Sequence, residues 1–299
     1  MAASKSTKKP TVRRRFYRLG GRLLLWGTVF ALIGAAGWVG ATRAWGAIQS
    51  RPEFRLDLQA FSLNGSPPWV NGPALSRELR RELTALPRAA SIFERDAARA
   101  VYHELTSSPW LTRVQRVQRR LPNRLLVRAT FRKPAGMARW EGQRILVDRN
   151  GYALPEDLFN APPEWDEERM PGIVDRLLSE PPPYGAPWDE PRMAVGARLT
   201  DYLRRAGLFD RLNVTTVDVT SVGRETTDPD IVLSTAGGVD IKWGASSVYP
   251  RVGLRKPPFL KPDEEKLAML LTKLESYPGL EGIQYVDLRF SKVYFRRQE

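Results

Sequence analysis

The sequence has no cysteine and only one histidine, and these absences limit its chemistry. Without cysteine, its 299 residues form no disulfide, bind no metal through thiolates and offer no thiol nucleophile. The histidine, His103, stands in the helical pattern "VYHEL" and is interpreted as a partly exposed helix side chain. The acidic runs Asp166–Arg169 and Asp263–Glu265 are interpreted as a solvated loop and a helix start. We therefore expect no catalytic residue, no metal site, no cofactor and no enzyme activity.

Acidic residues are scarce in the first half of the chain. Residues 1–22 hold eight Lys and Arg and no acid, and residues 51–150 hold 19 basic against 9 acidic residues. Residues 151–299 reverse this balance with 19 basic and 24 acidic residues, so the net charge of +14 belongs to the N-terminal half. A basic surface on this half of the chain would suit acidic partners or anionic lipid headgroups. Arginines that are merely solvated, with no binding role, would give the same composition.

One long uncharged run lies near the N-terminus. Leu23–Thr42 has twenty residues without a charge, and a helix of that length spans about 30 Å, the thickness of a bilayer core. Basic residues cluster before the run, and only Arg43 follows it closely, which predicts a cytoplasmic N-terminus and an extracytoplasmic bulk. We predict a basic cytoplasmic tail (1–22) and a single transmembrane helix (23–42) in the cytoplasmic, or inner, membrane.

Two alternatives compete for this N-terminal region. A cleaved signal peptide is one, but its hydrophobic core is normally shorter than twenty residues. A nucleic-acid-binding basic tail is the other. Membrane topology alone explains the tail, so we predict no nucleic-acid partner.

Residues 51–133 read as a small domain. Phe54–Leu63 predicts a strand, followed by the turn-rich insert "NGSPPWVNGP" and two amphipathic helices. The strand "LLVRATF" alternates regularly, whereas apolar residues in "LTRVQRVQR" recur every three positions, which predicts a bulged strand. The order is β-α-α-β-β, with two helices on a short sheet. The expected inward residues are Leu75, Leu79, Leu83 and Leu86 on the first helix and Ala97, Val101 and Leu105 on the second.

Residues 134–299 predict a mainly antiparallel sheet with flanking helices, so the fold class is α+β. Short strands are expected at "MARW", "RILVD", "YALP", "LNVTTVDV", "DIVLST" and "VDIKWG", with turns at "DRNG" and "AGG". One helix is expected from Val195 to Ala206, and a second begins at Asp263 as its cap. Two strands follow within Tyr285–Phe295, with a break at Ser291–Lys292.

Three stretches of the chain carry motifs in a fixed order. The first, "SPWLTRVQRVQRRLPNRLLVRATFRKPAGMARW", contains Pro109, Trp110, Pro122, Pro134, Ala138 and Trp140 in order and is followed by "ILVDRNG". The second is "RMPGI", and the third is "GGVDIKWG…KLAMLLTKLE…IQYVDLRFSKVYF". Together the three stretches cover about residues 50–296, and they resemble the bacterial cell-division protein family FtsQ, called DivIB in some lineages. The chain departs from the family pattern at Phe131, where an acidic residue is usual, and at the additional Ala135–Gly136.

The resemblance implies a POTRA-like domain at 51–133 and a C-terminal β domain at 134–299. It implies a non-enzymatic scaffold at the division septum, which recruits and regulates other division proteins, chiefly an FtsB–FtsL-like coiled-coil pair, and binds no small-molecule substrate. Two other classes stay open. One is a POTRA-bearing envelope assembly or transport factor, which would usually carry further repeats or a β-barrel. The other is a membrane-anchored periplasmic enzyme.

The stretch Tyr285–Glu299 is the candidate partner site. Its last strand is rich in aromatic residues, and Lys292, Arg296 and Arg297 protect it only partly as a sheet edge. We predict that a partner adds a strand to this edge, largely because of the resemblance. The alternative is that the strand merely closes the sheet and packs its aromatics inward. The predicted partner-binding residues are Phe290, Val293, Tyr294 and Phe295.

Overall fold

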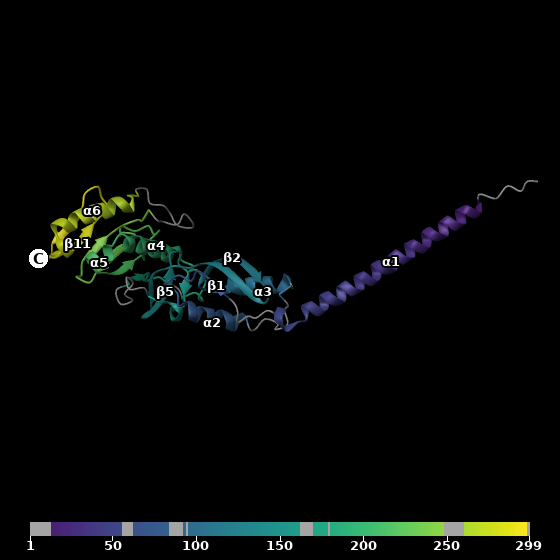
Figure 1. Cartoon of the computed structure of the whole chain (residues 1–299). Helices are drawn as coiled ribbons and strands as arrows, with labels where there is room; N and C mark the ends of the chain where they lie inside the picture. Colours follow the sequence, from purple (N-terminus) through teal and green to yellow (C-terminus); the bar gives the residue numbers. More distant parts are fainter. Residues whose placement is uncertain are drawn as a thin grey trace, which may run out of the picture.

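The computed structural model describes residues 13–55, 62–83, 92–93, 95–161, 170–178, 180–247 and 260–297. Helix α1 (Arg13–Gln49) projects away from the folded part, and the described chain ends on the opposite side of that part (Figure 1). Within α1, Leu25–Gln49 is long and apolar enough to cross a membrane, the only such helix in the described residues. Its apolar side chains are exposed, including Phe30 and Trp38. The first twelve residues of the predicted basic tail lie outside the described part.

A three-stranded sheet and two helices follow α1. The sheet contains β1 (Ser62–Asn64), β2 (Leu111–Arg120) and β3 (Arg124–Phe131) in the order β1-β3-β2. Strand β1 is parallel to β3, and β2 is antiparallel to it. The helices α2 (Gly72–Leu83) and α3 (Arg95–Ser107) lie between β1 and β2 in the chain, so the element order is the β-α-α-β-β order predicted. Phe54, the first residue of the predicted strand, belongs instead to a 3₁₀ helix, η1 (Pro52–Phe54). Residues 56–61 of that predicted strand lie outside the described part.

The predicted stripes of the two helices form the core of this unit. Leu75, Leu79 and Leu83 of α2 are buried, and so are Val101 and Leu105 of α3. Leu86 and the side chain of Ala97 lie outside the described residues. Apolar residues spaced by three or four positions share one helix face, and that face packs on the sheet.

The bulged strand is confirmed. The pairing of β2 with β3 shifts register between Leu111 and Arg113 and again between Val114 and Arg116. Each shift adds one residue to β2, so side chains three positions apart return to the same face. Leu111 and Val114 are therefore both buried.

In the described part of the chain, the larger sheet has nine strands, and the first of them in the sequence, β4, follows β3 after two residues. Its order is β12-β11-β10-β9-β8-β7-β4-β5-β6. The described α-helices of this part are α4 (Pro191–Arg205), α5 (Leu208–Leu212) and α6 (Asp263–Ser276). The strands are β4 (Pro134–Trp140), β5 (Gln143–Asp148), β6 (Ala153–Leu154), β7 (Gly172–Val174), β8 (Val214–Asp218), β9 (Val232–Thr235), β10 (Asp240–Lys242), β11 (Ile283–Asp287) and β12 (Tyr294–Arg297).

The α+β class is confirmed, and the large sheet is mixed, with five antiparallel and three parallel strand pairs. The pairs β4–β7, β7–β8 and β10–β11 are parallel, and the other pairs are antiparallel. Strand β7, which the sequence pattern did not predict, accounts for two of the three because it lies between β4 and β8 and runs parallel to both. Helix α4 also begins four residues earlier than expected, at Pro191, which suits the first turn of a helix.

Two hydrophobic clusters meet at β4–β6. On one face, Met137, Leu146 and Leu154 join the cluster built by α2, α3, β2 and β3. On the other face, Ala138 and Val147 join the cluster that fills the nine-stranded sheet and its helices. Successive side chains of a strand point to opposite faces, so these strands contribute to both clusters. The predicted division at 133/134 separates the two sheets but cuts through one cluster, and it stays a prediction.

Candidate functional site

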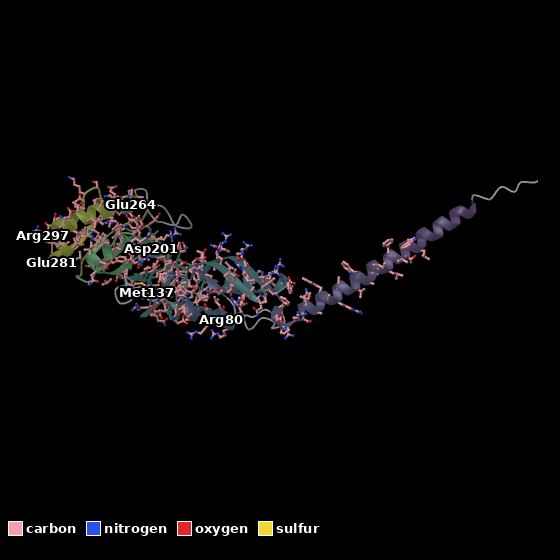
Figure 2. The ribbon with its side chains drawn as sticks, in the orientation of Figure 1. Arg80, Met137, Asp201, Glu264, Glu281 and Arg297 are labelled. Carbon is pink, nitrogen blue, oxygen red and sulfur yellow. The ribbon has the colours of Figure 1, made fainter. Side chains whose placement is uncertain are left out.

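The predicted partner site lies at an edge of the nine-stranded sheet. Strand β12 pairs antiparallel with β11 and is the last strand on that side, with Phe295 opposite Val286 and Tyr294 opposite Asp287. The break between the two strands is longer than predicted and spans Leu288–Val293. An edge strand directs alternate N–H and C=O groups away from its sheet, where an incoming strand can bind them. Figure 2 shows Arg297, at the end of β12, on the side of the molecule farthest from α1.

The opposite edge of the same sheet is covered by the chain itself. The amide of Ala153 in β6 donates to the carbonyl of Ala186 at 3.0 Å, and the amide of Gly185 donates to the carbonyl of Ala153 at 2.8 Å. Tyr152 and Pro187 extend this pairing as an isolated bridge. In the described part of the chain, no corresponding segment pairs with the outer side of β12. The edge at β12 can therefore accept a further strand, whereas the edge at β6 is already paired.

The four predicted site residues divide into two pairs. Phe290 and Tyr294 are 51% and 56% exposed, and their rings meet edge to face at 5.5 Å. Val293 and Phe295 are partly buried and pack against the core of the large sheet. The ring of Phe295 lies 5.6 Å from that of Tyr277. Phe290 and Tyr294 thus face solvent, whereas Val293 and Phe295 hold β12 against the protein.

The "VDLR" stretch orients the connection from β11 to β12. Arg289 Nη2 donates to Asp287 Oδ2 at 2.8 Å, and the Arg289 amide donates to Asp287 Oδ1 at 3.1 Å. The hydrogen bond to Asp287 raises the pKa of Arg289 above its ordinary value. Arg289 Nη1 also donates to the carbonyl of Thr227 at 3.2 Å. A glycine is required at position 244, where a Cβ would lie 2.7 Å from Arg289 Cγ. These residues hold the base of β12.

The prediction that Asp263 caps α6 through its side chain is wrong. Pro262 occupies the cap position, and no side-chain cap hydrogen bond forms there. The Asp263 carboxylate instead accepts hydrogen bonds from Trp243 Nε1 at 2.7 Å, from Ser246 Oγ at 2.6 Å and from the Ser247 amide at 2.8 Å. This buried cluster joins the start of α6 to the segment after β10. Its partners are 16–20 positions away in the sequence, so no local pattern indicates it.

Lys266 completes the buried cluster. Its Nζ lies 3.6 Å from Asp263 Oδ1 and donates a hydrogen bond to the carbonyl of Ala245. Burial lowers the pKa of Lys266, while the neighbouring Asp263 charge opposes that change. Burial also raises the pKa of Asp230 nearby. A buried charged pair satisfied in this way orders a local structure, and we assign it that role here.

His103 is exposed on α3, as predicted, with its ring edge-on to Tyr102 at 5.8 Å. Among the residues that the structure describes, no group of three His, Cys, Asp or Glu side chains is arranged to hold a metal ion. The predicted absence of enzyme activity stays a prediction.

No protein-family model matches the chain, and no curated protein matches it.

Proposed function

We propose that this chain is a non-enzymatic, single-pass membrane scaffold of the bacterial divisome that binds a partner by strand addition at β12. The observation that carries the proposal is the open edge at β12, in contrast to the covered edge at β6 on the opposite side of the same sheet. An open edge supplies a row of main-chain groups for a partner strand, and side chains beside it select the partner. Helix α1 supplies the membrane anchor.

The resemblance to the FtsQ and DivIB proteins supplies the biological setting of the proposal. The three-stranded unit is proposed as POTRA-like because two helices pack on a short sheet whose first strand is an edge parallel to β3. The N-terminus lies in the cytoplasm, the folded part outside it, and the protein acts at the septum in the cytoplasmic membrane. The proposed partner is an FtsB–FtsL-like pair, and one of its segments pairs with residues 294–297.

The side chains around β12 would shape that contact. Phe290 and Tyr294 form an exposed aromatic pair, and aromatic residues are frequent anchors in protein interfaces. Lys292 and Arg296 are exposed next to them, which favours an acidic strand or an acidic segment beside it. Affinity would come from the main chain, and specificity from these four side chains.

Two adjacent proline substitutions test the proposal in the full-length chain. Successive N–H groups of a strand point to opposite sides, so one of Tyr294→Pro and Phe295→Pro removes a bond to β11 and the other removes an outward donor. The outward variant should melt like its alanine control and yet lose at least tenfold in partner affinity, since proline also disturbs the register. Thermal melting and co-purification with an FtsB–FtsL pair measure the two effects.

The alanine controls separate the two pairs of side chains. Tyr294→Ala should weaken partner binding without changing the melting temperature, because the ring is exposed. Phe295→Ala should lower the melting temperature, because that ring packs on the core. If neither proline variant affects partner binding, β12 is not the interface. If both unfold the protein, the edge carries structure only, and strand addition is rejected.

A further inference from the structure

The turn that joins β2 to β3, residues 119–124 and called here the hairpin tip, combines charge with one exposed apolar side chain. Arg119, Arg120 and Arg124 are exposed, and Leu121 between them is 67% exposed. Among the described residues, neither Arg120 nor Arg124 forms an ion pair, whereas several other arginines do. A single exposed leucine is ordinary on a protein surface. The position of this leucine is what makes it informative.

The hairpin tip lies beside the C-terminal end of α1. Arg119 Nη1 donates to the carbonyl of Ile92 at 3.0 Å, and the Ile92 amide donates to the carbonyl of Phe54 at 2.8 Å. The ring of Phe93 lies 5.3 Å from Trp45, in the last turns of α1, and 5.1 Å from Phe54. These contacts connect the tip to the end of the apolar helix.

The hairpin that carries the tip is rich in positive charge. Between Glu104 and Glu141 the sequence contains no acidic residue, and Arg113, Arg116 and Arg128 are exposed along the same hairpin. Arg120, Leu121 and Arg124 also line a surface hollow of about 680 Å³. A hollow edged by arginines beside an apolar side chain matches a phosphate headgroup attached to acyl chains.

We propose that the hairpin tip binds the surface of an anionic phospholipid bilayer, with its arginines on headgroup phosphates and Leu121 in the interface. Arginine stems and apolar side chains both lie favourably at this depth, and anionic lipids attract basic residues near the surface. This inference rests on the proposed membrane-spanning role of α1, because only then does Trp45 mark the bilayer interface. The tip then gives the folded part a second membrane contact, which fixes its orientation on the bilayer.

A single engineered cysteine tests the contact, because the chain has none of its own. The full-length Leu121→Cys variant, labelled with an environment-sensitive fluorophore, is reconstituted into phosphatidylcholine vesicles and into phosphatidylcholine–phosphatidylglycerol vesicles. We expect a blue-shifted emission and reduced quenching by acrylamide in the anionic vesicles only. The same label on Thr112→Cys, at the exposed start of β2, should respond in neither.

Charge reversal tests the role of the arginines. Each arginine near an anionic surface contributes about fivefold to the contact equilibrium, so R120E/R124E should reduce the shielded fraction by at least about 25-fold. The matched control R211E/R224E makes the same change of charge at exposed positions outside the hairpin and should retain the shielding. Equal melting temperatures show that each variant is folded.

Three outcomes overturn the inference: equal shielding in neutral vesicles, no shielding in anionic ones, or shielding that appears only when duplex DNA is added. Extraction with alkaline carbonate separates this failure from failure of the proposed function. A chain that carbonate releases has no spanning helix, so the proposed function fails as well. A chain that stays in the membrane with an unshielded tip removes the lipid contact alone, and partner binding at β12 is unaffected.

Discussion

Asp263 should contribute far more to stability than an acidic residue in the first turn of a helix usually does. Its carboxylate is buried against Trp243 and two serines, and it neutralises the buried Lys266. Asp263→Ala would leave that ammonium group buried without its counter-charge, at a cost of about 3–5 kcal/mol. Urea denaturation of the variant and the original chain measures this difference.

The neighbouring Glu264 is the matched control for this prediction. It is also in the first turn of α6, but it is exposed. Glu264→Ala should change the free energy of unfolding by less than about 0.5 kcal/mol, as is usual for surface sites. Similar losses for the two variants would mean that only the helix dipole is involved and that the buried cluster contributes little.

For a single residue, the sequence predicts the role well only when its contact partners are close in the chain. Asp263 and Glu264 look alike in sequence, and both begin a predicted helix. The partners of Asp263 come from the segment after β10, which no helical or alternating pattern links to α6. Tyr294 and Phe295 are likewise neighbours with opposite surroundings. Strand alternation predicts that they face opposite sides but not which one faces the core.

Strands β4–β6 serve two cores, and this predicts different effects for adjacent residues of β5. Leu146 is fully buried in the cluster of α2, α3 and β2, whereas Val147 is fully buried in the cluster of the large sheet. Leu146→Ala should cost about 2–5 kcal/mol through the cavity it leaves. In the Leu146→Ala variant, protection of backbone amides from hydrogen exchange should fall chiefly in β2 and β3. In the Val147→Ala variant, the same protection should fall chiefly in β8 and β9.

This pair of variants also tests the division at 133/134. If both variants reduce exchange protection equally in both sheets, the two sheets unfold as one cooperative unit and the chain has no division there. If protection is lost separately, each cluster opens on its own, even though β5 contributes to both.

For helices and strands, the spacing of apolar residues predicts those elements that are long and regular. The bulge in β2 follows from apolar residues three positions apart in a stretch too short for a helix between Pro109 and Pro122. Strand β7 has only three residues, Gly172–Val174, and both of its neighbours come from distant parts of the chain. Three residues carry no measurable period, so only tertiary pairing identifies this strand.

The whole molecule has two functional ends in the proposals made above. The hairpin tip lies next to α1, and β12 lies on the far side of the folded part (Figure 1). If α1 spans the membrane with its N-terminus in the cytoplasm, both ends are extracytoplasmic. A cysteine at Ser291 should then react with a membrane-impermeant maleimide in intact cells, because Ser291 is exposed.

The control for this topology is a cysteine at Ser4, before the apolar run. It should react only after the membrane is permeabilised. The reverse labelling pattern would place the folded part in the cytoplasm, and loss of the N-terminal residues from the mature chain would identify the run as a cleaved signal peptide.

The covered edge at β6 limits how many copies of the chain can associate through the large sheet. Two copies that meet at β12 would pair about a twofold axis, and each would then present only the edge that residues 185–187 already cover. Among the residues that the structure describes, no unpaired strand of that sheet would remain for a third copy. Self-association by this route therefore stops at a dimer and does not propagate into a fibre, even at the high local concentrations of a membrane surface.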